Sequence, residues 1–428
     1  MLCAEKRIIT DSDADHDMKA FVEAYGCTLN FGESREIEDL IASRGWQIVD
    51  SPEHCDLAVL ATCVVIEKTE RAMLKRIREL SGAPRLVVTG CMATACREKA
   101  ERVAPNALFL APGDMGSLSE LIETANARTA AGKVKREAYG IVPIASGCLG
   151  NCAYCITRLA RGQLKSRPIP DTVESVYEMV SDHPREIQLT AQDTAAYGAD
   201  IGTDLPSLVR EICKIPRDFR LRIGMMNPKS VLSLVEGISE IYLEPKVFKF
   251  FHLPVQSASD RLLEHMERGY TLDEYRSIVE KVRDKVPHIT LSTDIIVGYP
   301  GETLEDHRLN LDFISRLRPD IVNVTRFSVR PGTKAATSKP QIVGWKAKER
   351  SREVTEARFK IALEKNSSWV GKRLRALSTE TGKRGSTILR TDEYKQVVVH
   401  RSLELGLYFG VEILGATPTY LTGRVEGE

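Results

Sequence analysis

The sequence predicts an α/β fold that ends in a small all-β module. Between residues 18 and about 365, short apolar runs alternate with segments of helical periodicity, a pattern typical of parallel sheets covered by helices. From residue 366 onward, short apolar runs are separated by turn-forming residues instead. A small and basic linker at 130–137 marks a boundary. We therefore predict three domains, at 18–128, 138–365 and 366–428.

The first domain is predicted to be a parallel sheet flanked by helices, with a cysteine after each of three strands. Cys27, Cys63 and Cys91 follow these strands directly. Because the carboxyl ends of parallel strands meet at one edge, the three thiols are expected in one crevice, with Cys96 as the one competing ligand. Ordinary buried cysteines are the alternative, but three equivalent positions favour a metal cluster. The expected strands are 21–26, 57–62 and 86–90, and the expected helices are 33–43, 67–80 and 116–126.

The second domain is predicted to be an open, partial barrel of the TIM type. Six apolar runs with helical crossovers favour this architecture, and they place the active site at the carboxyl ends of the strands. The predicted strands are 141–144, 186–190, 220–224, 248–253, 290–297 and 321–325.

The loop after the first barrel strand carries three further cysteines at short spacing. Cys148, Cys152 and Cys155 offer three thiolates and no fourth. Iron-sulfur cubanes normally take four thiolates, so this loop would leave one iron free to bind a small molecule. A structural zinc site is the alternative, but it would need a fourth ligand and usually a second cysteine pair. The spacing therefore favours an iron-sulfur cluster.

Composition and charge are those expected of an intracellular enzyme. The chain has ten cysteines, 43% hydrophobic residues and a net charge of +1. No apolar stretch is long enough for a membrane span, and the amino terminus lacks the layout of a signal peptide. The cysteines therefore indicate metal ligation in a reducing compartment, and we expect a cytoplasmic protein without membrane contact.

Two basic stretches are candidate surfaces for a polyanion. One follows the cluster loop and the other opens the carboxyl-terminal module, in which Arg390 is a further basic residue and Glu380 the one acid. A merely solvated face is the alternative for both. The candidate RNA contacts are Arg158, Arg161, Lys165, Arg167, Lys372, Arg373, Arg375, Lys383 and Arg384.

The cysteine motifs resemble those of a known family. The loop from Gly147 to Cys155 is similar to the radical-SAM signature, and the segments 25–30, 62–65 and 89–93 with the β-rich tail resemble the methylthiotransferases over nearly the whole chain. Further segments resemble the archaeal and eukaryotic branch that acts on N6-threonylcarbamoyladenosine in tRNA. Those segments are 193–198, 221–228 and 327–333.

The resemblance implies a mechanism and a set of cofactors. It implies two 4Fe-4S clusters, one on Cys27, Cys63 and Cys91 that carries sulfur and one on Cys148, Cys152 and Cys155. One S-adenosylmethionine would methylate the sulfur, and a second would give a 5′-deoxyadenosyl radical that removes hydrogen from carbon-2 of the adenine beside the anticodon. The carboxyl-terminal module would be a TRAM domain that binds RNA. No catalytic residue is expected beyond the cluster ligands.

Contacts to S-adenosylmethionine are expected at the strand ends of the barrel. Tyr154 is expected against the adenine, and Gln192 and Asp193 at the amino acid end. The segment from Asp294 to Glu302 resembles the adenine-binding strand of the superfamily, although the glycines within it also suit a plain strand-to-helix turn. The expected contacts are Tyr154, Gln192, Asp193, Asp294, Gly298 and Glu302.

Partners and alternatives follow from the same resemblance. The expected partners are the tRNA anticodon stem-loop, an electron donor such as a ferredoxin or flavodoxin, and a sulfur donor. The alternatives are a methylthiotransferase for isopentenyladenosine in tRNA or for a ribosomal protein, and a non-catalytic iron-sulfur protein that binds RNA.

Overall fold

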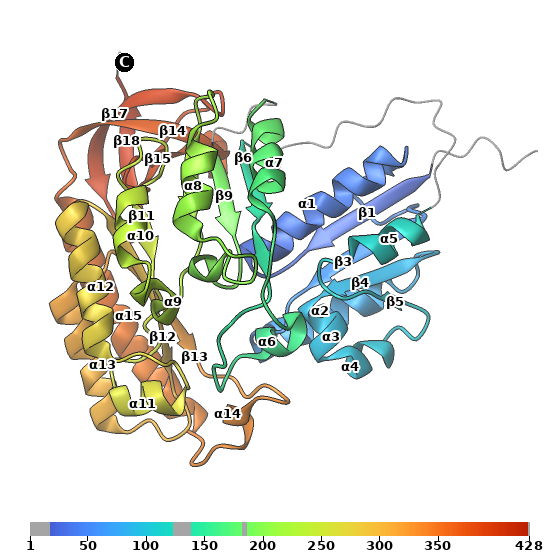
Figure 1. Ribbon diagram of the computed structural model, residues 1–428, viewed down its shortest axis with the longest axis horizontal. Helices are drawn as coiled ribbons and strands as arrows, with labels where there is room; N and C mark the ends of the chain where they lie inside the picture. Colours follow the sequence, from blue (N-terminus) through green and yellow to red (C-terminus); the bar gives the residue numbers. More distant parts are fainter. Residues whose placement is uncertain (1–17, 123–137, 182–185, 427–428) are drawn as a thin grey trace, which may run out of the picture. The chain divides into compact units, whose positions relative to one another are not determined.

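The computed structural model describes residues 18–122, 138–181 and 186–426, and the chain forms two compact units (Figure 1). The first unit holds the amino-terminal sheet. The second holds the barrel and the carboxyl-terminal module, together with the short segment Val64–Thr69. The predicted third domain therefore packs with the barrel as one unit.

The first unit is a five-stranded parallel sheet with the order β2-β1-β3-β4-β5. Every residue of the central strand β3 is buried, as expected where helices cover both faces of a sheet. The strands are β1 (Lys19–Ala24), β2 (Gln47–Ile48), β3 (Leu57–Thr62), β4 (Leu86–Gly90) and β5 (Leu108–Phe109). The helices are α1 (Thr28–Ser43), α2 (Glu67–Leu80), α3 (Cys91–Ala95), α4 (Arg97–Glu101) and α5 (Met115–Leu121).

Helix α1 begins five residues earlier than predicted. Gly26 has a φ of +115°, which lets the chain turn directly from β1 into the helix. The Asn30 side chain donates to the carbonyls of Tyr25 (2.7 Å) and Thr62 (2.8 Å), and so fixes the first turn of α1 to the ends of β1 and β3. The predicted helix 116–126 is described only to Leu121, and its last four residues lie outside the described residues.

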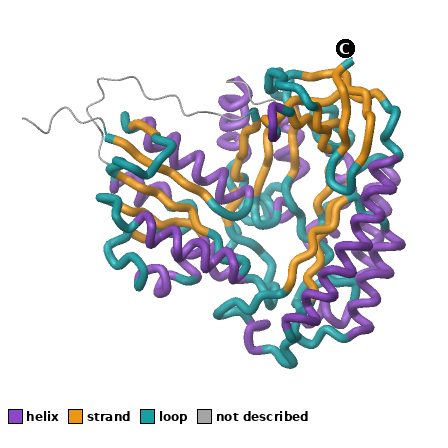
Figure 2. The backbone as a smooth tube through the Cα atoms, turned by 180° about the vertical axis from the view of Figure 1, so that it is seen from behind, coloured by secondary structure: helices purple, strands orange, loops and turns teal. Residues whose placement is uncertain are grey.

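The core of the second unit is an open set of six parallel strands, as predicted. Backbone hydrogen bonds join these strands into two three-stranded sheets, β10-β9-β6 and β11-β12-β13, and a parallel bridge between Leu221 and Val247 links the two. No pairing joins β6 to β13 in the part of the chain that the structure describes, so the barrel is not closed. Figure 2 shows its strands with helices along their outer side. The strands are β6 (Tyr139–Pro143), β9 (Glu186–Thr190), β10 (Arg220–Ile223), β11 (Phe250–His252), β12 (Thr290–Val297) and β13 (Ile321–Arg326).

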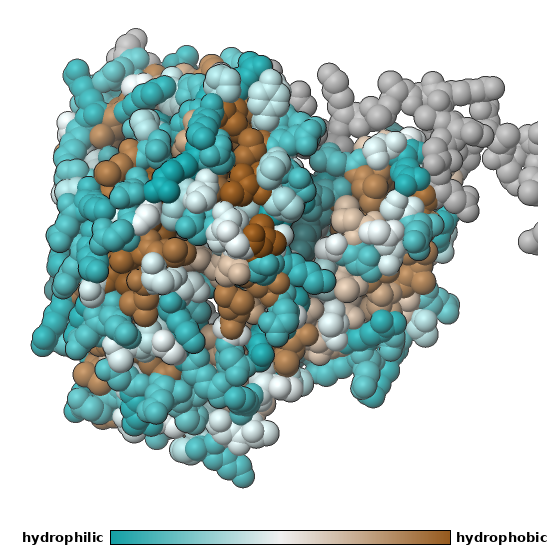
Figure 3. All heavy atoms as spheres, viewed as in Figure 1, coloured by the Kyte–Doolittle hydropathy of each residue, from teal (hydrophilic) through white to brown (hydrophobic). Residues whose placement is uncertain are grey.

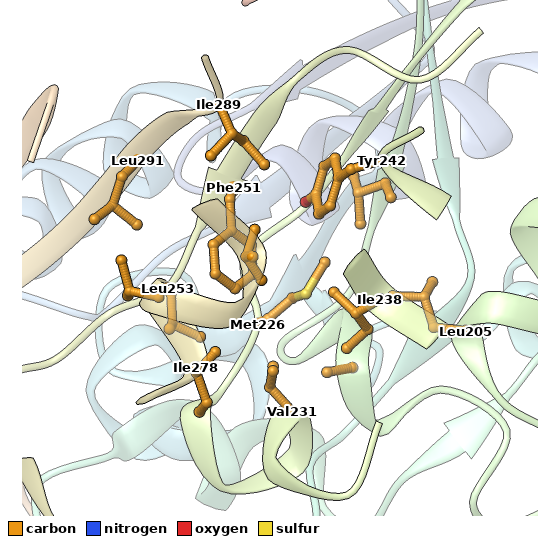
Figure 4. Packing of buried hydrophobic residues seen from close by; sticks show 14 of the residues in the cluster. Leu205, Met226, Val231, Ile238, Tyr242, Phe251, Leu253, Ile278, Ile289 and Leu291 are labelled. Atoms are coloured by element: carbon orange, nitrogen blue, oxygen red, sulfur yellow. The ribbon is translucent and has the colours of Figure 1, made fainter. Parts of the chain in front are cut away.

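Buried apolar side chains fill the space between the barrel strands and their helices. Figure 4 shows Met226, Phe251 and Leu253 facing Ile238 and Tyr242, all of them buried. Burying each such side chain stabilises the folded state by about 1.5–3 kcal/mol compared with leaving it exposed to water. The short strands β7 (Ala145–Ser146) and β8 (Lys165–Ser166) flank the cluster loop. The helices are α6 (Ile156–Arg161), α7 (Ile169–Ser181), α8 (Leu205–Cys213), α9 (Pro228–Leu232), α10 (Val235–Ile241), α11 (Asp260–His265), α12 (Leu272–Lys285), α13 (Leu304–Leu317), α14 (Lys334–Thr337) and α15 (Gly344–Ser367).

The carboxyl-terminal module is a closed five-stranded barrel with the order β14-β15-β16-β18-β17. Closure leaves no strand edge unpaired. Leu389, Val397, Val411 and Leu421 form the centre of its core. The strands are β14 (Arg373–Thr381), β15 (Thr387–Thr391), β16 (Gln396–Val399), β17 (Tyr408–Ala416) and β18 (Leu421–Val425).

Hydrophilic side chains cover most of the face drawn in Figure 3, with smaller apolar areas between them. Among the described residues, no helix has the length and apolar character that crossing a membrane requires.

Candidate functional site

The loop between β7 and α6 holds the three closely spaced cysteines. Glycine is required at Gly147, where a Cβ would lie 1.9 Å from the Gln163 carbonyl oxygen. At Gly150 a Cβ would lie 3.3 Å from Cys148 Sγ, a tight contact, and 3.8 Å from Cys152 Sγ. The Gly150 N–H donates to Cys148 Sγ (3.2 Å). The loop therefore wraps closely around two of the sulfurs and supplies a backbone donor to one of them.

A buried arginine supports the same loop. Arg268 is 6% exposed, and its Nη1–H donates to Cys152 Sγ (3.1 Å). Its Nη2–H groups donate to Asn227 Oδ1 (3.3 Å) and to the Pro254 carbonyl (3.4 Å). A positive charge beside the sulfur favours the thiolate, the form that binds iron. Arg268 belongs to no motif, so the sequence alone did not reveal it.

The donor set suits an iron-sulfur cluster better than a single metal ion. In the described chain, no three His, Cys, Asp or Glu side chains converge as ligands of one ion. A cubane binds each thiolate through a different iron, so its ligands need not meet at one point. Burial raises the pKa of Cys148 to about 11 and also raises that of Cys155, which means that these thiols ionise on binding a metal. The three sulfurs, the glycine loop and Arg268 fit a cluster.

Tyr154 lies in an apolar cluster beside the loop. It packs with Leu262, Met266 and Tyr299. The Tyr154 and Tyr299 rings meet edge to face, with their centroids 6.3 Å apart. Burial raises the pKa of the Tyr154 hydroxyl well above its usual range. The ring is thus available as an uncharged flat surface, which is what stacking on an adenine needs.

Gln192 and Asp193 follow β9 but differ in their surroundings. The Gln192 Oε1 is buried without a hydrogen-bond partner among the described residues, which suits contact with a ligand. Asp193 is 2% exposed, and its carboxylate accepts from Ala195 N, Asn227 N and Ser230 Oγ. Burial raises its pKa despite these donors. Asp193 therefore joins the loops after β9 and β10, and its contact with S-adenosylmethionine stays a prediction.

Asp294 lies on β12 between two side chains of the neighbouring strands. Its Oδ1 lies 3.0 Å from His252 Nε2 on β11 and accepts from Asn323 Nδ2 (2.7 Å) on β13. The carboxylate is 27% exposed, so it is accessible to a ligand in the interior of the barrel.

Gly298 and Glu302 form a strand-to-helix turn between β12 and α13. The Gly298 N–H donates to Glu302 Oε2 (2.7 Å), and Arg350 also binds this carboxylate. Gly298 has a φ of +73°, and a Cβ there would lie 2.6 Å from Ala347 Cβ. The Glu302 side chain is fully buried, and its Oε2 joins the turn to α15, whereas its Oε1 has no hydrogen-bond partner among the described residues. A ligand contact at Gly298 and Glu302 stays a prediction beside the alternative of a plain turn.

The three amino-terminal cysteines lie at one edge of the first sheet. Cys27 is the residue before α1, Cys63 follows β3 and Cys91 opens α3, and their three strands are neighbours in the order β1-β3-β4. A Cβ on Gly26 would lie 2.6 Å from Cys63 Cβ, which shows how close the first two loops come. Cys96 lies at the far end of α3. The predicted convergence of strand ends is confirmed.

The basic residues of the carboxyl-terminal module divide into two groups. Lys372, Arg373, Arg375, Lys383 and Arg384 are exposed. Arg375 lies over the Tyr408 ring at 3.8 Å, and Lys372 lies over the Trp369 ring at 4.4 Å. Grouping Arg390 with them was wrong, because it is largely buried and donates to Glu380 Oε1 (3.0 Å).

The basic residues after the cluster loop lie on α6, on β8 and directly after β8. Lys165 is exposed, whereas Arg158, Arg161 and Arg167 are partly buried. Arg158 bonds to Asn151 Oδ1, and Arg161 Nη1 donates to Ser146 Oγ (3.3 Å). These two arginines therefore hold the cluster loop as well as presenting positive charge beside it.

Two family models match the chain. Residues 19–111 match the uncharacterized protein family UPF0004, and residues 142–314 match the radical SAM superfamily. Among solved structures, the radical S-adenosylmethionine methyltransferase TsrM from Kitasatospora setae, with cobalamin and a [4Fe-4S] cluster bound, has a TM-score of 0.54. It is 14% identical, over 75% of this chain and 77% of that one, and so it shows a shared fold.

Curated relatives extend the match over the full length. A probable threonylcarbamoyladenosine tRNA methylthiotransferase from Pyrococcus horikoshii is 38% identical, over 95% of this chain and 99% of its own. A similarly named protein from Archaeoglobus fulgidus is 37% identical, over 96% and 99%. A tRNA-2-methylthio-N(6)-dimethylallyladenosine synthase from Aquifex aeolicus is 31% identical, over 95% and 98%. The chain therefore belongs to the radical-SAM tRNA methylthiotransferases, in the threonylcarbamoyladenosine branch.

Proposed function

We propose that this protein attaches a methylthio group to carbon-2 of N6-threonylcarbamoyladenosine next to the anticodon of tRNA. The observation that carries the proposal is the 38% identity to the Pyrococcus horikoshii relative over 99% of that protein's length. The positions of the two sets of three cysteines support it. One set lies at the carboxyl ends of three neighbouring parallel strands, and the other lies in the loop after β7.

The chemistry is divided between the cofactors and the chain. When bound, the 4Fe-4S clusters and S-adenosylmethionine supply the sulfur, the methyl group and the radical that removes hydrogen from carbon-2. Cys148, Cys152 and Cys155 would hold one cluster, and Cys27, Cys63 and Cys91 the other. We propose that two molecules of S-adenosylmethionine are used in each turnover.

The remaining site residues position groups and exclude water. Tyr154 would cover the adenine of S-adenosylmethionine, and Gln192 and Asp294 would bind its polar ends. Asp193 would act by joining the loops after β9 and β10, and Gly298 and Glu302 by holding the turn after β12 against α15. Arg268 would hold Cys152 Sγ and the cluster loop in place.

The reaction also needs partners. We propose a low-potential electron donor such as a ferredoxin or flavodoxin, a separate sulfur donor, and the tRNA anticodon stem-loop, bound through the exposed basic residues of the TRAM-like module and the rim around Arg158. We propose that the reaction takes place in the cytoplasm.

Nucleoside analysis by mass spectrometry tests the function directly. Reconstituted protein with S-adenosylmethionine, dithionite and tRNA containing threonylcarbamoyladenosine is expected to yield the 2-methylthio nucleoside. tRNA containing isopentenyladenosine is expected to yield none, and the reverse result would assign the chain to the Aquifex aeolicus type of activity.

A further inference from the structure

A cavity of about 380 Å³ lies inside the second unit, between the barrel strands and the carboxyl-terminal module. Thr290 and Ile321, the first residues of β12 and β13, line it, and so does Tyr394 of the module. His252 and Asn323 line it further along the strands, and both of these side chains contact the Asp294 carboxylate. The cavity therefore extends from the module to His252 and Asn323, and these two side chains contact Asp294, a candidate cofactor contact.

Positive charge predominates in the cavity. Arg222, Arg358, Arg390 and Lys395 line it, and Asp320 is the only carboxylate among the described lining residues. Asp320 is already paired, with Lys395 Nζ at 2.7 Å and Lys365 Nζ at 2.6 Å. Arg390 is bonded to Glu380. Arg222 and Arg358 are the two remaining cations among these lining residues.

Neither Arg222 nor Arg358 has a carboxylate partner in the described parts of the chain. Arg222 Nη1 donates to Gln188 Oε1 (3.2 Å), and the guanidinium lies over the Phe250 and Tyr394 rings at 5.1 and 5.4 Å. Arg358 Nη1 donates to the Val322 carbonyl (2.6 Å), and burial lowers its pKa.

Both guanidinium groups have an unused buried donor. The Nε atoms of Arg222 and Arg358 are buried without a hydrogen-bond partner among the described residues, and so is the Thr290 hydroxyl. A buried cation with an unmet N–H is destabilising unless a ligand supplies the acceptor. Arg390 Nε is also buried without a partner among the described residues, so four such donors belong to residues that line the cavity, and they indicate a binding site for an anion.

We propose that this cavity binds the carboxylate of the threonylcarbamoyl group of the substrate base. The inference rests on the proposed function and adds the residues that select the substrate. Guanidinium groups present paired donors that match a carboxylate, whereas the apolar dimethylallyl group of the related substrate would leave them unpaired. A cavity of this size admits the side group of a base, while the continuous ribose-phosphate backbone would need an open groove. Arg222 and Arg358 are therefore specificity-determining residues.

RNA binding by the reconstituted full-length protein tests the proposal. The probes are three anticodon stem-loops that differ at one base: threonylcarbamoyladenosine, its analogue with a neutral carboxamide in place of the carboxylate, and unmodified adenosine. The wild type is expected to bind the carboxylate form at least about tenfold more tightly than the carboxamide, as charge-assisted hydrogen bonds allow. Arg222→Gln with Arg358→Gln is expected to reduce this ratio to about twofold or less.

Controls separate the site from general effects. Arg308→Gln, at an exposed arginine of α13 (67% exposed), is expected to keep the wild-type ratio. Arg222→Lys with Arg358→Lys retains the charges and is expected to keep an intermediate ratio, and iron content and thermal unfolding temperature check that all variants fold.

Two results would overturn the proposal. One is equal binding of the carboxylate and carboxamide RNAs by the wild type. The other is an equal loss of affinity for all three RNAs in the glutamine variant, which would assign the cavity to an RNA phosphate. Failure of the proposed function is distinguishable from both, because it would appear as a missing methylthio product with the carboxylate preference intact.

Discussion

Arg268 connects the cluster loop to the barrel through one buried side chain. It donates to Cys152 Sγ, Asn227 Oδ1 and the Pro254 carbonyl, and its Nε donates to Tyr270 Oη (3.3 Å). A fixed positive charge this close to a thiolate ligand stabilises the more negative, reduced state of a bound cluster. Arg268 is a positioning residue with an electrostatic effect on electron transfer.

Replacing that charge is expected to change the reduction potential. In Arg268→Gln the midpoint potential of the radical-SAM cluster should become more negative by tens of millivolts, since about 1.4 kcal/mol corresponds to about 59 mV for one electron. EPR-monitored redox titration measures it, and Arg308→Gln at an exposed residue of α13 is the matched control. An unchanged potential at full iron content would show that Arg268 only supports the fold.

The site residues differ in how far they could be predicted from the sequence. The six cysteines proposed as cluster ligands are found from the sequence, because their spacing and their places after apolar runs are local features of the chain, and their role as ligands stays a prediction. Arg222, Arg268 and Arg358 could not, because each comes from a different element and only the fold brings it to its site. The place of Asp193 after a strand predicts a ligand contact, and the structure adds hydrogen bonds from Asn227 and Ser230, 34 and 37 positions away, that no local pattern indicates.

At the scale of elements, continuous apolar runs were the most reliable signal. The predicted bounds of β3, β4, β9, β12 and α2 are confirmed. Strands β15 and β18 have a weaker local signal, because each of their sequences, TILRT and LTGRV, holds only two apolar side chains among Thr, Arg and Gly. Such strands are stable only within a closed barrel, so their signal is not local.

The beginning of α13 gives a prediction about stability. Thr303 and Asp306 form a capping box, and the Asp306 carboxylate also accepts from Ser259 Oγ (2.6 Å) and binds Arg261. Burial alone would raise the pKa of Asp306, but these donors outweigh it and lower the pKa to about 2. Because the pKa is depressed, the stabilisation is present above the unfolded value of about 3.9 and is lost as the pH falls from there toward 2.

Asp306→Asn is therefore expected to lower the free energy of unfolding by roughly 1–2 kcal/mol at neutral pH. Urea unfolding of the reconstituted protein under argon measures the difference. It should be the same at pH 7 and at pH 5, because both lie above the titration range. If the difference in unfolding free energy between wild type and variant changed from pH 7 to pH 5, a titrating group other than Asp306 would be responsible.

At the scale of the whole molecule, the two sets of cysteines are expected to have separable roles. A Cys27, Cys63 and Cys91 triple alanine variant should retain about half of the wild-type iron and still cleave S-adenosylmethionine under dithionite, but form no methylthio product. Iron analysis, Mössbauer spectra and product chromatography measure these quantities.

The matched control is the corresponding alanine variant of Cys148, Cys152 and Cys155, which should also retain about half of the iron but cleave no S-adenosylmethionine. Loss of all iron in either variant, or wild-type methylthiolation in the first, would contradict the assignment of two independent clusters.

The closed barrel at the carboxyl end is expected to hold the tRNA backbone through its exposed cations. Each phosphate contact releases counterions on binding and adds roughly 0.7–0.9 to the slope of log affinity against log salt. Neutralising the five exposed basic residues together should therefore weaken tRNA binding and flatten this slope. The residues are Lys372, Arg373, Arg375, Lys383 and Arg384.

A tRNA titration across a salt series measures both effects, and an equally large loss of charge elsewhere on the second unit is the control. That control variant neutralises exposed residues on α8, α12, α13 and α15 and the residue after α8, and it should keep most of the slope. Cleavage of S-adenosylmethionine without tRNA should survive in both variants, because neither set contacts the cluster loop.

If affinity and slope were identical in wild type and the first variant, the rim around Arg158, Arg161, Lys165 and Arg167 would be the RNA-binding surface instead. The control residues are Arg210, Lys214, Arg276, Arg316 and Lys348.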